Sequence, residues 1–350
     1  MSSTKLQSPT KLIELPKLPI ERAITDRVAL LDFGTRAHQL LIEQREEWPM
    51  LRRDYASLPD VQTRKIDFDD FEIVLQYNPA RLISSAAKVD AKSVRERKCF
   101  LCTPNLPRDQ RGLDFGREYV ILCNPFPIFP EHFTIPHKEH RHQQIGGNLD
   151  IMLQLAQQMA PRYTIFYNGP RCGASAPDHL HFQAGSRGFM PIDREYERIT
   201  RRTPALIESS TFNVYTVENY LRRFISIESS DPVVLNKVFA AIESAMQQIA
   251  GTDTDEPLMN VLASYENDTW RVIVFPRAKH RPSFYFAEGD EKILLSPAAV
   301  EMGGTCAVPL QKDFKRLDRE HIVQAFNEVT VPADQFAHLC HTLAATLASI

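Results

Sequence analysis

Hydrophobic spacing along the chain predicts a centre rich in strands between two helical ends. Apolar residues recur at helical spacing over 24–47, within a lead-in segment of residues 1–66, and again over 318–350, where two closing helices are expected. The centre has short apolar runs bounded by Pro, Gly and Asn, which predict strands, and helical patterns over 148–159 and 232–249. The order of these elements is typical of an α+β fold with an antiparallel sheet. The expected strands are 67–77, 118–123, 132–135, 163–167, 179–183, one or two within 212–228, 259–264, 269–275 and 292–295.

Similar segments in the two halves of the centre indicate a duplicated unit. Residues 133–141 resemble 274–281, since each is a strand closed by proline with a His-Arg pair starting four residues after that proline. A fainter similarity links 165–168 to 293–296. We therefore expect a duplication, with coincidence as the alternative. The chain then comprises the lead-in (1–66), a first unit (67–200), a second, degenerate unit (201–317) and the closing helices (318–350).

Two histidines and a glutamine alternate along the strand expected at 179–183. Because successive strand side chains point to opposite faces, His179, His181 and Gln183 share one face, with apolar residues on the other. A glycine-bearing loop precedes them, and together these features favour a site on a rigid support. The alternative is an edge strand whose histidines meet water. The second half contains no His-x-His pair, so one site per chain is expected.

Composition excludes several classes of protein. The chain has 350 residues, of which 43% are hydrophobic and 24% charged, and a net charge of −3, which is ordinary for a globular protein. No apolar run approaches the roughly 18 residues of a membrane helix, and the first residues lack a signal-peptide pattern. We expect a cytoplasmic protein that binds neither nucleic acid nor membrane, and six cysteines without a disulfide framework.

Cys99 and Cys102 form one Cys-x-x-Cys pair, and no second pair completes a four-cysteine zinc site. A zinc ion bound there must therefore take histidine ligands. His179 is well placed as the third ligand, since its neighbour His181 then stays free. The fourth is expected from the histidines at 137, 140 and 142, with His140 favoured. The alternative is a pair of buried thiols beside a solvated histidine cluster.

His181 is the candidate for covalent chemistry. A neutral imidazole is a good nucleophile toward phosphorus near pH 7. Gln183, on the same face, can donate to a phosphate oxygen as charge develops there. The loop residues Asn168, Gly173 and Ser175 can add backbone N–H groups and a hydroxyl around the same phosphate. The P-loop, the dinucleotide fingerprint and the nucleophile elbow are all absent from the sequence.

The run Asn-x-x-x-x-Gly-Ala-Ser at 168–175, followed by His-Leu-His-Phe-Gln-Ala at 179–184, resembles the signature of the histidine-triad superfamily in its transferase branch. That branch carries His-x-His-x-Gln where the hydrolase branch has a third histidine. It includes galactose-1-phosphate uridylyltransferase, diadenosine tetraphosphate phosphorylase and the GDP-hexose phosphorylases. The resemblance covers about residues 67–185, is weaker over 212–310, and implies duplicated histidine-triad-like units.

The resemblance also implies roles for single residues. His181 matches the nucleophile that takes a nucleoside monophosphate, and Gln183 matches the glutamine that steadies it. His179 matches a zinc ligand of the uridylyltransferases, or an orienting residue in members without zinc. Asn124 lies where the family contacts the nucleoside. Asp178 is one extra residue relative to the family pattern.

The expected function is that of a nucleotidyltransferase or phosphorylase with a nucleotidyl-histidine intermediate and a structural zinc. Its substrate would be a nucleoside diphosphate sugar or a dinucleoside polyphosphate, and its acceptor phosphate or a sugar phosphate. Arg277 and Lys279, which follow a strand, are expected to reach the transferred or leaving phosphate, with a surface role as the alternative. A histidine-triad hydrolase and a catalytically degenerate nucleotide- or zinc-binding protein are the other candidates. Many members of the family are dimers, so the resemblance implies a homodimer.

Overall fold

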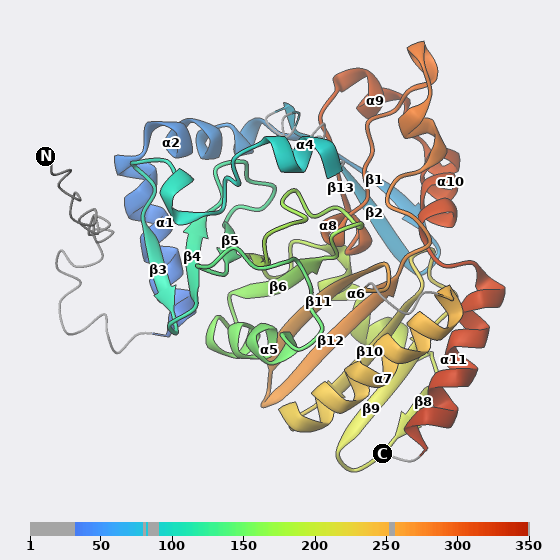
Figure 1. Ribbon diagram of the computed structural model, residues 1–350. Helices are drawn as coiled ribbons and strands as arrows, with labels where there is room; N and C mark the ends of the chain where they lie inside the picture. Colours follow the sequence, from blue (N-terminus) through green and yellow to red (C-terminus); the bar gives the residue numbers. More distant parts are fainter. Residues whose placement is uncertain (1–31, 80–81, 83–90, 252–255, 349–350) are drawn as a thin grey trace, which may run out of the picture.

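The computed structural model describes residues 32–79, 82, 91–251 and 256–348, and one ten-stranded antiparallel sheet forms its centre (Figure 1). In spatial order its strands are β3 (Gly112–Phe115), β4 (Tyr119–Cys123), β5 (His132–Pro136), β7 (His181–Ser186), β6 (Tyr163–Asn168), β11 (Met259–Glu266), β12 (Thr269–Pro276), β10 (Phe224–Ser229), β9 (Phe212–Val217) and β8 (Ala205–Glu208). The predicted α+β class with an antiparallel sheet is confirmed.

The sheet consists of two copies of one unit, in which three strands, a helix and two further strands follow each other along the chain. The helix is α5 (Leu149–Gln158) in the first unit and α7 (Pro232–Ala250) in the second. Strands β6 and β11 pair at the centre of the sheet, with Tyr167 opposite Val261. The duplication is confirmed, but the expected correspondences are wrong. The topology matches β6 with β11 and β7 with β12, because the order of pairing, not local sequence similarity, defines the copy.

The strand expected at 292–295 is not formed, and β13 (Thr305–Val308) is the last strand of the described chain. Ile293 and Leu295 are buried, as an apolar run predicts, but the backbone N–H of Leu294 donates to the Asp313 carboxylate at 2.8 Å and not to a strand. β13 pairs in parallel with β2 (Phe71–Tyr77), which forms a hairpin with β1 (Gln62–Phe68). The single strand expected over 67–77 is therefore one arm of this hairpin and its turn.

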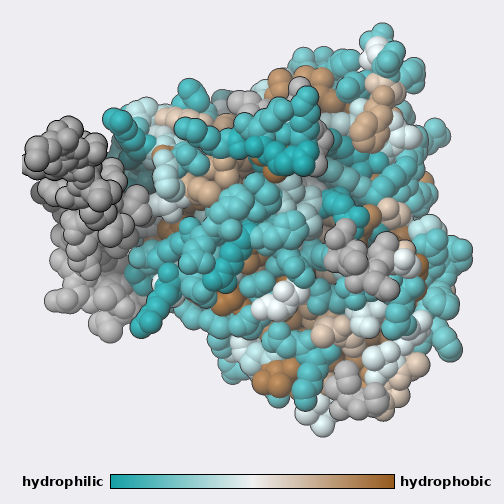
Figure 2. Space-filling view, in the orientation of Figure 1, coloured by the Kyte–Doolittle hydropathy of each residue, from teal (hydrophilic) through white to brown (hydrophobic). Residues whose placement is uncertain are grey.

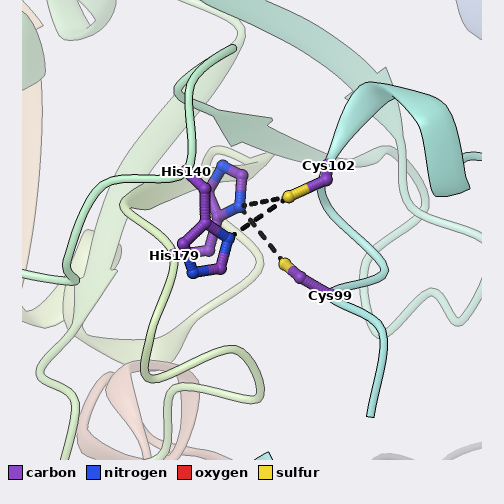
Figure 3. Close-up of side chains that lie close together, drawn as sticks. All are labelled: Cys99, Cys102, His140 and His179. Carbon is purple, nitrogen blue, oxygen red and sulfur yellow. Dashed lines mark hydrogen bonds between the residues drawn. The ribbon is translucent and has the colours of Figure 1, made fainter. Parts of the chain in front are cut away.

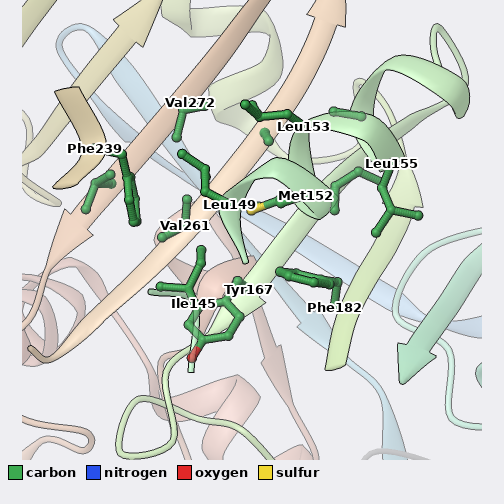
Figure 4. Packing of buried hydrophobic residues seen from close by; sticks show 14 of the residues in the cluster. Ile145, Leu149, Met152, Leu153, Leu155, Tyr167, Phe182, Phe239, Val261 and Val272 are labelled. Atoms are coloured by element: carbon green, nitrogen blue, oxygen red, sulfur yellow. The ribbon is translucent and has the colours of Figure 1, made fainter. Parts of the chain in front are cut away.

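Helices cover one face of the large sheet. α5 packs on β6 and β11, α7 packs on β10, and α11 (Ala333–Leu347) packs on α7. Side chains such as Leu149 and Met152 fill the core between helix and sheet (Figure 4). Helix α7 has the boundaries that its sequence predicts. The Asp231 carboxylate accepts from the Val233 N–H at 2.8 Å, and Gly251 takes the left-handed conformation that ends the helix.

The opposite face is covered by the three-stranded sheet of β1, β2 and β13 together with α6 (Pro191–Thr200), α8 (Ala299–Met302), α9 (Gln311–Arg316) and α10 (Arg319–Val329). Toward the amino terminus, α1 (Phe33–Glu47) and α2 (Pro49–Ala56) are helical as expected for the lead-in, whereas its residues 62–66 belong to β1. Residues 24–31 of the helix expected there lie outside the described residues. Hydrophilic side chains cover most of the face seen in Figure 2. Of the described helices, none is long and apolar enough to cross a membrane.

Candidate active site and metal centre

The candidate active site is a cavity of about 420 Å³ on the face of the sheet opposite α5 and α7. Strand β7 begins at His181, two residues after the start that the sequence predicts (179–183). From there the alternation holds, because Phe182 and Ala184 enter the core on the α5 side while His181 and Gln183 line the cavity. Both units contribute to its walls, the first through β5–β7 and the second through residues 280–281 and 296–301.

His181 is held so that one ring nitrogen remains available. Its Nδ1 lies 2.8 Å from the backbone carbonyl oxygen of His179. A carbonyl only accepts, so Nδ1 carries the proton and Nε2 has the lone pair. Among the described residues, Nε2 has no hydrogen-bond partner. Burial lowers the pKa of His181 to about 4, which keeps the imidazole neutral at pH 7.

Gln143 connects the end of β6 with the start of β7. Its side chain is fully buried, and its oxygen accepts from the His181 backbone N–H at 2.8 Å. Its Nε2 donates to the carbonyl oxygens of Asn168 at 2.9 Å and of His181 at 3.2 Å. Sequence reasoning missed Gln143, because it follows a charged and histidine-rich run that is typical of a solvated loop.

The predicted loop residues Asn168, Gly173 and Ser175 all line the cavity, as does Asn124. The side-chain oxygen of Asn168 accepts from the Asn260 side chain at 2.9 Å and from the Ala299 backbone N–H at 2.8 Å. These bonds fix the start of the loop against the second unit. Gly173 has a φ of +100°, and a Cβ there would approach the Ala298 Cβ to 2.5 Å. Glycine is therefore required where the chain passes this close to α8.

The structure does not bring Arg277 and Lys279 into the cavity. Arg277 is 3% exposed, and its guanidinium donates to the carbonyl oxygens of Val329 at 3.1 Å and of Pro297 at 3.0 Å. It thus holds the loops around β12 together. Lys279 forms an ion pair with Glu328 at 2.7 Å on the surface.

His280 and Arg281 line the cavity from the same segment. The Ser296 hydroxyl lies 3.2 Å from His280 Nε2 and accepts from Arg281 Nε at 2.9 Å. The Arg281 guanidinium also stacks on the Tyr285 ring at 4.1 Å, and no carboxylate among the described residues pairs with it. Sequence reasoning missed both residues, since nothing in the pattern shows that Arg277 is buried against carbonyl groups while Arg281 lines the cavity.

Cys99, Cys102, His140 and His179 converge beside the cavity (Figure 3). Cys99 Sγ lies 3.2 Å from His179 Nδ1, and Cys102 Sγ lies 3.2 Å from His140 Nδ1 and 3.6 Å from His179 Nδ1. Tetrahedral zinc, with bonds of about 2.3 Å to sulfur and 2.0–2.1 Å to nitrogen, separates its ligand atoms by roughly 3.5 Å. The four predicted ligands can therefore hold a metal ion. Of the three candidate histidines, His140 is the one in the cluster.

The surroundings of the cluster also fit a metal. His179 Nε2 donates to the His137 carbonyl oxygen at 2.7 Å, which leaves the Nδ1 lone pair facing the thiols. His140 Nε2 lies 3.4 Å from the Asp178 carboxylate, an arrangement that orients a ligand imidazole. Burial, together with the neighbouring Cys99, raises the pKa of Cys102 to about 11, and a divalent cation would offset that cost of two adjacent thiolates. The extra Asp178 thus contacts a member of the cluster.

Comparison with known proteins agrees with this geometry. The fold is similar to that of yeast Ap4A phosphorylase Apa2, with a TM-score of 0.60 at 14% identity over 86% of this chain and 98% of that one. The structure of the same yeast protein in complex with AMP gives a TM-score of 0.51 at 16% identity, over 84% and 97% of the two chains. The chain thus shares the fold of this phosphorylase, and the resemblance of the sequence to the transferase branch of the histidine-triad superfamily is confirmed.

Two family models match the sequence itself. Residues 194–350 match the model described as GDPGP1-like, C-terminal domain. Residues 40–186 match the model described as Domain of unknown function (DUF4922). No curated protein matches the sequence. The two matched regions correspond closely to the two units of the sheet and their flanking helices.

Proposed function

We propose that the chain is a nucleotidyltransferase or phosphorylase that forms a covalent nucleotidyl-His181 intermediate. The observation that carries this proposal is His181 Nε2, which has no hydrogen-bond partner among the described residues and belongs to a neutral imidazole lining a 420 Å³ cavity. The comparisons support nucleotide substrates, because the similar yeast protein is an Ap4A phosphorylase and one of its structures contains AMP. The substrate is a nucleoside diphosphate sugar or a dinucleoside polyphosphate.

In the first step, His181 Nε2 attacks the α-phosphorus of the substrate. A P–N bond forms, and the P–O bond to the sugar phosphate or nucleoside polyphosphate breaks, with its electron pair leaving on that oxygen. The imidazole gains positive charge as the bond forms, and the His179 carbonyl 2.8 Å from Nδ1 stabilises that charge. In the second step an oxygen of phosphate or a sugar phosphate attacks the same phosphorus, the P–N bond breaks, and Nε2 regains its lone pair.

Three groups around the cavity offset the charge of the phosphates. The amide of Gln183 and the backbone N–H groups of the 173–175 loop donate from the first unit. Arg281 provides a guanidinium from the second unit. The degenerate second unit thus supplies a phosphate contact and no nucleophile, since β12 contains no histidine.

We further propose that the ion held by the four-residue cluster is zinc with a structural role. Two thiolates and two imidazoles form a ligand set that zinc prefers, and they leave no position for water or substrate. Bound zinc would supply a fixed crosslink that joins the 99–102 turn to His140, which follows β5, and to His179, which precedes β7. His179 would then be held through its side chain, and its carbonyl, 2.8 Å from His181 Nδ1, orients His181.

A substrate panel tests the proposed function. Nucleotide sugars and dinucleoside polyphosphates are each incubated with the protein, with and without inorganic phosphate, and the nucleotide products are separated by chromatography. We expect a nucleoside diphosphate product that depends on phosphate. Formation of nucleoside monophosphate without phosphate would instead identify a hydrolase. No turnover of any substrate would contradict an enzymatic role.

Replacing Arg281 with alanine is expected to lower kcat/KM by roughly 10- to 100-fold, because a charge-assisted hydrogen bond to the substrate phosphate is lost. Arg281→Lys should recover part of this loss. Lys279→Ala is the matched control, since Lys279 lies in the same segment but pairs with Glu328 outside the cavity. Equal kcat/KM for Arg281→Ala and Lys279→Ala would show that Arg281 does not contact substrate.

A further inference from the structure

His132, the first residue of β5, contacts Gln183 from the neighbouring strand. In the ladder between β5 and β7, Thr134 lies opposite Gln183, so His132 is the diagonal neighbour on the same face. Its Nε2 lies 3.0 Å from Gln183 Oε1, and both side chains line the cavity. The active-site amide therefore has a histidine partner at its oxygen.

The hydrogen bonds of His132 determine which ring nitrogen carries the proton. The Ile128 backbone N–H lies 3.4 Å from His132 Nδ1. An N–H group only donates, so Nδ1 must accept through its lone pair. The proton is then on Nε2, which donates to the Gln183 side chain. Of the two polar atoms of that amide, only the oxygen can accept, and it lies 3.0 Å away. These two hydrogen bonds fix the Gln183 amide with its oxygen toward His132 and its nitrogen turned away.

The imidazole has no room to turn. His132 is 1% exposed, and its ring packs against Phe129 at a centroid distance of 5.2 Å and against Phe166 at 5.9 Å. The Tyr55 hydroxyl accepts from its backbone N–H at 3.2 Å and donates to its carbonyl at 3.1 Å. Both the backbone and the ring of His132 are thus held before substrate binds.

We propose that His132 is a positioning residue that orients the Gln183 amide so that its NH₂ group, and not its oxygen, faces the phosphate. This inference rests on the proposed function of the cavity. An amide presenting its oxygen to phosphate oxygens would repel them, whereas the NH₂ group donates to them as negative charge develops. His132 touches Gln183 and not the reacting atoms, so it acts through the orientation of that amide.

Two substitutions separate the hydrogen bond from the packing. His132→Met replaces the imidazole with an apolar side chain of similar length and removes the donor, whereas His132→Gln keeps an N–H donor near the position of Nε2. We expect kcat to fall roughly 10- to 100-fold in His132→Met, with KM little changed, because the orientation matters most in the transition state. His132→Gln should recover most of that loss. His338→Met, at an exposed position on α11, is the control and should match the wild type.

A double-mutant cycle shows whether His132 acts through Gln183. In a Gln183→Ala background, His132→Met is expected to change kcat by less than about twofold, because the amide it orients is gone. Losses that multiply would overturn the proposal and assign His132 a role independent of Gln183.

Nitrogen-15 spectra of histidine-labelled wild-type protein test the orientation without turnover, with His132→Gln assigning the resonances. We expect His132 to be neutral with its proton on Nε2, and that resonance to shift in Gln183→Ala. A proton on Nδ1, or a doubly protonated ring, would overturn the proposal. If the substrate panel gives no turnover, the proposed function fails while these spectra still decide how Gln183 is held.

Discussion

Replacing His181 with alanine is expected to lower kcat by about four orders of magnitude or more, because the substitution removes the only atom that forms the covalent bond. The fold should survive. The ring occupies a cavity wall, and the backbone contacts of residue 181 with Gln143 do not depend on the imidazole. Steady-state kinetics on the best substrate of the panel measure the loss, and thermal unfolding checks the fold.

Added imidazole gives this prediction a positive control. In His181→Gly the space of the ring is vacant, and free imidazole can attack the α-phosphorus in its place to give a nucleoside phosphorimidazolide. We expect the rate to rise with imidazole concentration in His181→Gly and not in the wild type. An exposed histidine on α11 offers the matched comparison, since His338→Gly should keep wild-type activity. A His181→Ala protein with more than about a tenth of wild-type activity would rule out the covalent mechanism.

Removing the metal is expected to produce the second largest effect, on stability. At a free zinc concentration of about 1,000 times the Kd, binding adds about 4 kcal/mol to the free energy of unfolding. Chelation, or Cys99→Ser, should therefore lower Tm by on the order of 5–10 °C in a chain of this length. Activity should fall as well, because the His179 carbonyl that orients His181 loses its fixed position.

The histidine cluster provides matched variants for this measurement. His140→Ala should lose the metal, whereas His142→Ala should retain one ion per chain, since His142 is exposed and outside the four-residue cluster. Metal content is measured by elemental analysis after purification. Chelator should not lower the Tm of Cys99→Ser any further. Equal metal content in His140→Ala and His142→Ala would show that the cluster is not a metal site.

Features set by local sequence were predictable. The boundaries of α7 follow from Asp231, Pro232 and Gly251, and the alternation in β7 separates Phe182 from His181 and Gln183. The Cys-x-x-Cys turn and His179 were recognisable because their residue types have few other joint uses. Such signals involve neighbours along the chain, so a single sequence contains them.

Features that depend on distant partners were not predictable. The run at 292–295 is as apolar as a strand, but no strand of the described residues pairs with it, and the Leu294 N–H donates to the Asp313 carboxylate instead. Arg277 and Arg281 are both basic residues after β12, and only tertiary packing decides that the first is buried on carbonyls while the second faces the cavity. His132 and Gln183 are 51 positions apart and meet only through the ladder of β5 and β7.

Intact-protein mass spectrometry tests the central claim most directly. The protein is incubated with the best donor of the panel in the absence of any acceptor, and the modified residue is then mapped under conditions that preserve the acid-labile P–N bond. The covalent mechanism predicts one nucleoside monophosphate per chain on His181, no adduct in His181→Ala, and loss of the adduct when phosphate is added. Turnover without any adduct, or an adduct on another residue, would contradict it.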